Sequence, residues 1–208
     1  MRRLLEVALV SAILTALCIV TIDQPLARWL ATRDTSPALW NETIGVLEYP
    51  LDIVPWKWTG ICVLVAGSLV TLVVTRLRSY AAVFLIVTLT HLLSRHASLW
   101  VKSATGRLRP SQWLSSDGDT FWRDGGFSFP SGHVLLFASI VIPIVLVYPR
   151  ARPLLAIVAF VMIARVLVNA HFVSDVLGGL AAVALFTWLS ARLVRRALPS
   201  QILPASLR

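Results

Sequence analysis

Three short polar clusters interrupt a chain that is otherwise strongly apolar. They span residues 102–110 (KSATGRLRP), 130–133 (PSGH) and 165–175. Together they supply the cations Lys102, Arg109 and Arg165, the imidazoles of His133 and His171, and the carboxylate of Asp175. Charged groups at membrane depth are costly and mark functional sites by default. This set of groups is suited to binding a phosphate and transferring it to a histidine.

The third cluster holds the candidate nucleophile. His171 and Asp175 are four positions apart, so on a helix they would share a face. A carboxylate bonded to one ring nitrogen leaves the other nitrogen with a free lone pair, and it stabilises the positive ring that forms on attack. We predict that His171 is the nucleophile and that Asp175 supports it. For this spacing alone, a polar pair that merely satisfies a helix end remains the alternative.

The second cluster is typical of an anion site at a helix start. Ser131 and Gly132 would expose backbone N–H groups where the helix dipole also favours an anion. His133 would then stand beside the bound phosphate and protonate the departing oxygen. Simple helix capping by Ser131 is the alternative interpretation.

The first cluster adds cations around a predicted break in a helix. Gly106 and Pro110 favour that break, after which Lys102 and Arg109 can fold round one anion. Arginine offers a planar fork to phosphate oxygens and lysine a point charge. A cationic stretch at the membrane interface is the alternative, and we expect Arg107 to be a weaker candidate that faces solvent.

Composition places the chain among integral membrane proteins. Hydrophobic residues make up 57% of its 208 residues and charged residues 14%, against roughly 25% in soluble domains. The net charge of +9 arises from small basic groups between apolar runs, a pattern that does not suit a nucleic-acid surface. Cys18 and Cys62 lie inside apolar runs, so we expect no disulfide, and no metal-type Cys/His spacing occurs.

Apolar runs long enough to cross a bilayer predict an all-α membrane protein with six transmembrane helices in a single domain, residues 1–208. The expected spans are about 4–22, 53–75, 80–101, 133–149, 154–173 and 175–194. We expect the first span to be a transmembrane helix and not a secretory signal that is cleaved off. The segment 23–52 is too polar to span, and it predicts an interfacial helix with Trp29 and Trp40 at headgroup depth.

The loops alternate between basic and acidic. Short basic loops would face the cytoplasm under the positive-inside rule, which predicts that both termini are cytoplasmic. The basic residues are Arg2, Arg3, Arg76, Arg78, Arg150, Arg152, Arg192, Arg195 and Arg196. The three polar clusters would then meet on the opposite, outer face of the membrane.

The clusters resemble the signature of the type 2 phosphatidic acid phosphatase (PAP2) superfamily: Lys-x6-Arg-Pro, Pro-Ser-Gly-His and Ser-Arg-x5-His-x3-Asp. One position departs, because Ala164 stands where the family usually has serine. The resemblance implies a PAP2-like helical bundle in which His171 forms a phosphohistidine, Asp175 supports it and His133 protonates the leaving group. It implies phosphate binding by Lys102, Arg109, Ser131, Gly132 and Arg165, with no metal and no cofactor.

We therefore expect a bacterial inner-membrane lipid phosphatase with its site facing the periplasm or exterior. Candidate substrates are phosphatidic acid, phosphatidylglycerophosphate, undecaprenyl diphosphate and phosphorylated lipid A; no nucleic acid and no obligate protein partner is implied. The alternatives are a lipid-to-lipid phosphotransferase and a non-catalytic membrane protein that only binds an anion. Outside the signature, we expect His91 and His96 to be structural or interfacial, and Arg95 to lean towards the outer interface or touch a lipid headgroup. The aromatic residues that we expect to be belt or packing residues are Trp100, Trp113, Phe121 and Trp122.

Overall fold

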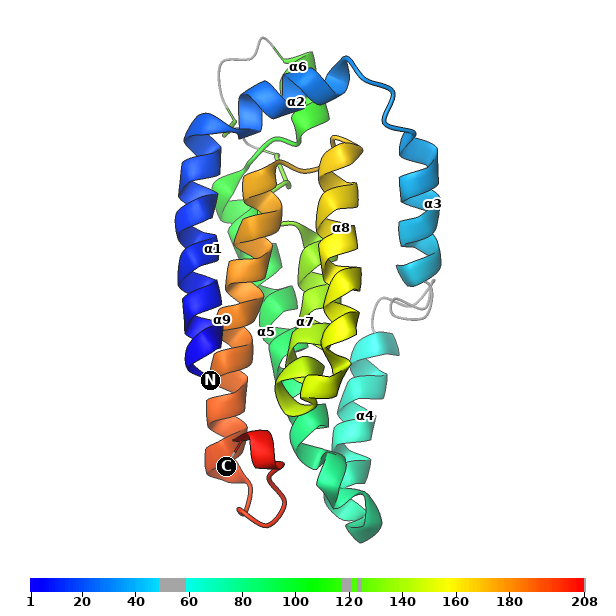
Figure 1. Ribbon diagram of the computed structural model, residues 1–208, viewed down its shortest axis with the longest axis vertical. Coiled ribbons are helices and arrows are strands. Elements are labelled where there is room, and N and C mark those ends of the chain that lie inside the picture. The colour runs from blue at the N-terminus through cyan, green and yellow to red at the C-terminus, as the bar shows by residue number, and fades with distance from the viewer. Residues whose placement is uncertain (49–58, 117–120, 123–124, 208) are drawn as a thin grey trace.

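The computed structural model describes residues 1–48, 59–116, 121–122 and 125–207, and this part of the chain is a bundle of helices (Figure 1). It contains no β-strand, only an isolated bridge between Arg107 and Trp122. The predicted all-α class is confirmed. Both cysteines are free, as expected.

The helices follow the predicted apolar segments closely. The described α-helices are α1 (Arg2–Thr21), α2 (Asp23–Ala31), α3 (Pro37–Glu48), α4 (Thr59–Val73), α5 (Ala81–Thr105), α6 (Pro110–Ser115), α7 (Gly132–Val147), α8 (Leu155–Leu167) and α9 (Val173–Ala197). Each predicted span contains one helix, although 53–58 lie outside the described residues. By length and apolarity, three helical stretches in the described part of the chain suffice to cross a membrane. They are α1 (Arg2–Thr21), α5 together with the 3-10 helix before it (Thr75–Thr105), and α9 (Val173–Ala197).

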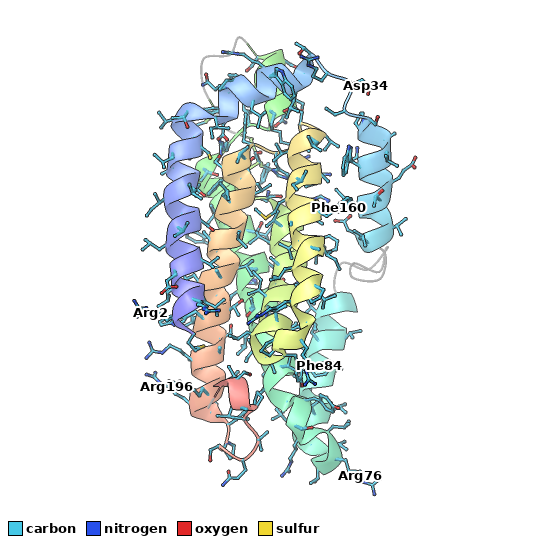
Figure 2. The ribbon with its side chains drawn as sticks, in the orientation of Figure 1. Arg2, Asp34, Arg76, Phe84, Phe160 and Arg196 are labelled. Atoms are coloured by element: carbon cyan, nitrogen blue, oxygen red, sulfur yellow. The ribbon has the colours of Figure 1, made fainter. Side chains whose placement is uncertain are left out.

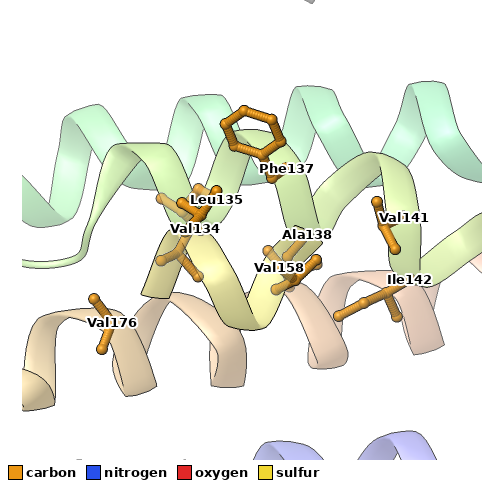
Figure 3. Packing of buried hydrophobic residues seen from close by; sticks show 10 residues of the cluster. Val134, Leu135, Phe137, Ala138, Val141, Ile142, Val158 and Val176 are labelled. Atoms are coloured by element: carbon orange, nitrogen blue, oxygen red, sulfur yellow. The ribbon is translucent and has the colours of Figure 1, made fainter. Parts of the chain in front are cut away.

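Helices α5, α7, α8 and α9 form the centre of the bundle, with α1 along α9 and α4 along α5 (Figure 1). Buried aliphatic side chains such as Val134, Val158 and Val176 fill the space between α7, α8 and α9 (Figure 3). Gly179 lets α9 approach α7, since a Cβ there would lie 3.3 Å from Cβ of Val134. This close packing fixes the starts of α7 and α9 relative to each other.

The two ends of the bundle differ in character. Arg2, Arg76 and Arg196 lie towards the lower end in Figure 2, where both chain termini also lie, whereas Asp34 lies at the upper end. The C-terminal end of α5 and the N-terminal ends of α7 and α9 lie at the upper end. The topology therefore brings all three polar clusters to the end opposite the termini.

The segment 23–52 differs from the single interfacial helix that we expected. It forms two helices, α2 and α3, and Pro50 and Asp52 lie outside the described residues. Trp29 is exposed, but the ring of Trp40 packs against Phe160 of α8 with centroids 5.5 Å apart. Apolar contact with α8 thus draws α3 onto the bundle.

Candidate active site

Direct hydrogen bonds join the three polar clusters. The backbone N–H of Ser131 donates to the carbonyl of Asp175 at 3.0 Å, so the second cluster lies against the third. Lys102 Nζ donates to the carbonyl of Phe127 at 2.7 Å, which ties the first cluster to the segment before Pro130. Residues spread along the sequence from 102 to 175 therefore meet at one end of the bundle.

The predicted break in the first cluster is confirmed. Helix α5 ends at Gly106, which adopts the left-handed conformation (φ 53°) and donates its N–H to the carbonyl of Lys102 at 3.1 Å. Pro110 then opens α6, with Arg109 as its N-cap and the Arg109 N–H bound to Gln112 Oε1 at 2.9 Å. Lys102 itself still lies within α5, one turn before that end.

His171 and Asp175 meet as predicted, but not on a shared helix face. Helix α8 ends at Leu167, so His171 lies in the following loop, and α9 begins at Val173. Nδ1 of His171 faces Oδ2 of Asp175 at 3.3 Å. The same oxygen accepts from the Phe172 N–H at 2.9 Å and from Ser128 Oγ at 2.5 Å. These contacts engage Nδ1 and leave Nε2 as the nitrogen available for attack.

Burial keeps the His171 imidazole neutral. The ring is 2% exposed, and this desolvation lowers the pKa of His171 to about 4. Asp175 opposes the shift, while the positive charges of Lys102 and Arg165 add to it. A neutral ring at physiological pH carries the lone pair that a nucleophile requires.

Arg107, which we expected to face solvent, is wholly buried, and that expectation was wrong. Its Nη1 donates to Oδ1 of Asp175 at 2.8 Å and to Ser174 Oγ at 2.5 Å, and its Nη2 donates to Oδ2 of Asp23 at 2.7 Å. Asp23 also accepts from the N–H of Ser174 at 3.1 Å and from its hydroxyl. The backbone bridge to Trp122 and the turn after Gly106 direct Arg107 inward, where two carboxylates compensate its charge.

Aromatic rings enclose this buried ion cluster. The guanidinium of Arg107 lies 4.7 Å from the ring centroid of Phe172 and 4.9 Å from that of Phe121. Trp113 packs against both rings, so of the two roles expected for Trp113 and Phe121, belt or packing, the structure shows packing. Because the rings exclude water, the attraction between Arg107 and its carboxylates is screened far less than at a surface.

Two of the signature residues, His133 and Arg165, contact side chains of α3. Nε2 of His133 pairs with Oε1 of Glu48 at 2.9 Å, and both side chains are about a quarter exposed. Nη1 of Arg165 donates to Oδ1 of Asn41 at 3.2 Å. The Glu48 carboxylate and the Asn41 amide oxygen thus bind side chains for which we predicted a role in binding the phosphate or protonating the leaving group.

Polar atoms without partners also point to a ligand. Ser131 is the N-cap of α7, yet its side chain makes no capping bond, so the capping alternative fails. Its hydroxyl is buried and, among the described residues, has no hydrogen-bond partner; Nε of Arg165 is in the same state. Buried donors left unpaired are costly, and an anion in this site would satisfy them.

Sequence reasoning missed five residues that shape the site: Asp23, Asn41, Glu48, Ser128 and Ser174. Each lies outside the signature positions, and three of them come from the segment that we expected at the interface. Asp23 carried the clearest overlooked signal, an acid placed directly after the first apolar run.

Replacing Arg107 should destabilise the protein severely. In Arg107→Gln, Asp23 and Asp175 keep buried charges without their cation, a loss worth about 3–5 kcal/mol. Thermal unfolding of the purified protein in detergent should show a large drop in midpoint. Arg76→Gln, at an exposed arginine at the other end, is the matched control and should change little. Equal midpoints for the two variants would contradict a supporting role for the Arg107 ion cluster.

The His171 ring should resist protonation. With its pKa lowered to about 4, its isotope-labelled histidine NMR signal should stay in the neutral form from pH 8 down to about pH 5. Comparison with the spectrum of His171→Ala assigns the signal. Titration near the ordinary histidine pKa would show that the ring is not held in the dry environment described above.

Comparisons with known proteins agree with the geometry. Over 96 residues the chain is 35% identical to the lipid A 1-phosphatase of Rhizobium johnstonii, a match covering 44% of this chain and 39% of that protein. The lipid A 1-phosphatase of Rhizobium etli is 34% identical over 96 residues, covering 44% and 41%. The match therefore spans about two fifths of the length of these curated relatives.

The fold has a solved counterpart. The chain superposes on the crystal structure of a transmembrane PAP2-type phosphatidylglycerolphosphate phosphatase from Bacillus subtilis with a TM-score of 0.61 and 21% sequence identity. That likeness covers 96% of this chain and 100% of the other. The PAP2 superfamily model matches residues 77–199, a stretch that contains all three polar clusters. The chain is a member of the PAP2 superfamily.

Proposed function

We propose that this protein is an integral membrane lipid phosphatase that removes a terminal phosphate from a lipid phosphate or diphosphate. One observation carries the proposal: a buried, neutral His171 is held by Asp175 at the point where the three polar clusters meet. An anion-binding protein without catalysis has no need for an oriented imidazole. Membership of the PAP2 superfamily supports the same chemistry.

The proposed reaction has two steps. Nε2 of His171 attacks phosphorus while the bond to the lipid oxygen breaks, and His133 gives that oxygen its proton. Water then attacks the phosphohistidine, His133 takes a proton from the water, and the electron pair of the P–N bond returns to Nε2. Asp175 stabilises the positive ring in between. Phosphate leaves and the enzyme is restored.

Phosphate binding relieves repulsion among the cations. Arg109 lies close enough to both Lys102 and Arg165 for its charge to act on each of them. A phosphate placed among the three would neutralise this repulsion and pair with the unsatisfied hydroxyl of Ser131. The N–H groups at the start of α7, from Gly132 on, add donors along the helix dipole. These positive charges and N–H dipoles would stabilise the charge that develops in the transition state, and we propose that no metal ion or other cofactor is required.

The substrate is a lipid phosphate of the bilayer. The curated relatives are named lipid A 1-phosphatases and the solved neighbour a phosphatidylglycerolphosphate phosphatase, which supports phosphorylated lipids as the class. Phosphatidic acid and undecaprenyl diphosphate belong to the same chemical class. Neither a nucleic acid nor an obligate protein partner enters the proposed reaction.

His171→Ala tests the proposal. The variant should release no phosphate from any member of a lipid phosphate panel in detergent micelles, because the nucleophile is gone. His96→Ala, at an exposed histidine of α5, is the control and should retain activity. Wild-type activity should also persist in excess EDTA. Undiminished release by His171→Ala would end the phosphatase assignment, and phosphate release without an acceptor lipid would exclude obligate transfer to a second lipid.

We further propose that α1, α4, α5, α7, α8 and α9 all cross the bacterial inner membrane, within a single domain that spans residues 1–208. Both termini and the basic loops would then face the cytoplasm and the site the exterior or periplasm, in line with the positive-inside rule. In a cysteine-free background, Ser111→Cys in α6 should react with a membrane-impermeant maleimide added outside intact cells. Arg150→Cys, at the opposite end, should react only after permeabilisation. The reverse pattern would invert the proposed topology.

A further inference from the structure

We propose that a cleft between α5 and α7 is a second substrate subsite, which binds the carbonyl oxygens that join a lipid's acyl chains to its phosphate-bearing backbone. This inference rests on the proposed function and adds to it a basis for choosing among lipid phosphates. The residues that line the cleft lie outside the PAP2 signature.

One face of α5 carries a row of polar side chains from the middle of the helix to its C-terminal end. His91, Ser94, Arg95, Ser98 and Lys102 follow one another at intervals of three or four residues, apart from the adjacent pair 94–95, so they share one side of the helix. At 1.5 Å per residue, Arg95 lies roughly 10 Å and His91 roughly 16 Å below Lys102 along the helix axis. Polar groups at that depth are costly unless they have a task.

A cavity follows this row of polar side chains. It has a volume of about 190 Å³, and its walls include Ser94, Arg95 and Ser98 of α5 and Gly132 of α7. Gly132 is one of the proposed phosphate-binding residues, and apart from its chain neighbours and the nearby backbone of α7 no atom lies within 4 Å of where a Cβ on it would stand. Leu99, 63% exposed, lies at the rim. The cleft thus runs from the phosphate site to the side of the bundle that faces the bilayer.

The lining favours hydrogen-bond acceptors. Ser94 is 1% exposed, and its hydroxyl has no hydrogen-bond partner among the described residues. Arg95 brings guanidinium donors to the same cleft. His91, which we expected to be structural or interfacial, is bonded through Nδ1 to Ser139 Oγ at 2.9 Å and also lines the cleft. An ester or amide carbonyl would satisfy the buried hydroxyl of Ser94, whereas an isoprenyl or alkyl chain would leave it unpaired at a cost.

The position of the cleft fits this occupant. In an acylated lipid phosphate, the carbonyls lie a few bonds from the phosphorus, and the hydrocarbon chains follow them. With the phosphate held near Lys102 and Gly132, the carbonyls would reach the level of Ser98 and Ser94, and the chains would leave past Leu99 into the bilayer. The subsite would therefore favour acylated lipids over polyprenyl phosphates.

Two matched substrates test the subsite: diacyl phosphatidic acid and its dialkyl ether analogue, which has the same phosphate but no carbonyls. We expect wild-type kcat/KM to favour the ester by about fivefold or more, the effect of one or two hydrogen bonds. Ser94→Ala and Arg95→Gln should each reduce this ratio towards one by lowering turnover of the ester alone. Ser103→Ala, an exposed serine of the same helix, should keep the wild-type ratio. Thermal unfolding midpoints confirm that the variants are folded.

Several results would overturn the inference. A wild-type ratio near one would do so, as would equal losses on both lipids in Ser94→Ala and Arg95→Gln. A higher kcat/KM for a lipid with a second phosphate than for both test lipids would indicate that the cleft binds an anion and not carbonyl oxygens. Dissociation constants of the ester and ether lipids, measured with the His171→Ala variant, which we expect to be inactive, test carbonyl binding separately from phosphate release. An ester preference in binding, without any turnover by the wild type, would keep the subsite and contradict the proposed function.

Discussion

The buried ion cluster of Arg107 with Asp23 and Asp175 is the interaction on which the site depends. None of the three side chains reaches solvent, so each charge is tolerable only while the others are present. Arg107 takes Oδ1 of Asp175 and thereby leaves Oδ2 for His171 and Ser128. The cluster also fastens α2, the loop after α5 and the start of α9 to one another. The carboxylate that we propose supports the nucleophile is thus held in place by residues that need not touch the substrate.

His133 and Arg165, two of the groups proposed to act on the phosphate, have fewer hydrogen bonds than His171 and Asp175 among the described residues. The ring of His171 is rigidly framed, but His133 and Arg165 make single contacts to Glu48 and Asn41 of α3. In the proposed reaction a phosphate would compete with those two oxygens for the same donors. If His171 is the nucleophile, as proposed, the site has a fixed part that holds its ring and an exchangeable part, His133 and Arg165, that accepts and releases the anion.

The sequence was sufficient to predict the helices and the meeting of the three polar clusters at one end of the bundle, because the lengths of apolar runs are local signals that set where each helix begins and ends. It was not sufficient for Arg107, whose inward direction depends on a bridge to Trp122 and on a carboxylate 84 positions away in the chain. It also placed His171 and Asp175 on one helix, whereas a loop and a helix start bring them together. Long-range charge compensation leaves no periodic pattern, so only the fold shows it.

The regiochemistry of the phosphohistidine tests the central claim most directly. A single turnover can be quenched and the modified histidine identified by phosphorus NMR of the isolated peptide. Because Asp175, anchored by Arg107, engages Nδ1 of His171, the account predicts phosphate on Nε2 of His171 alone. Phosphate on Nδ1, or on another residue, would show that the buried cluster does not orient the nucleophile as described.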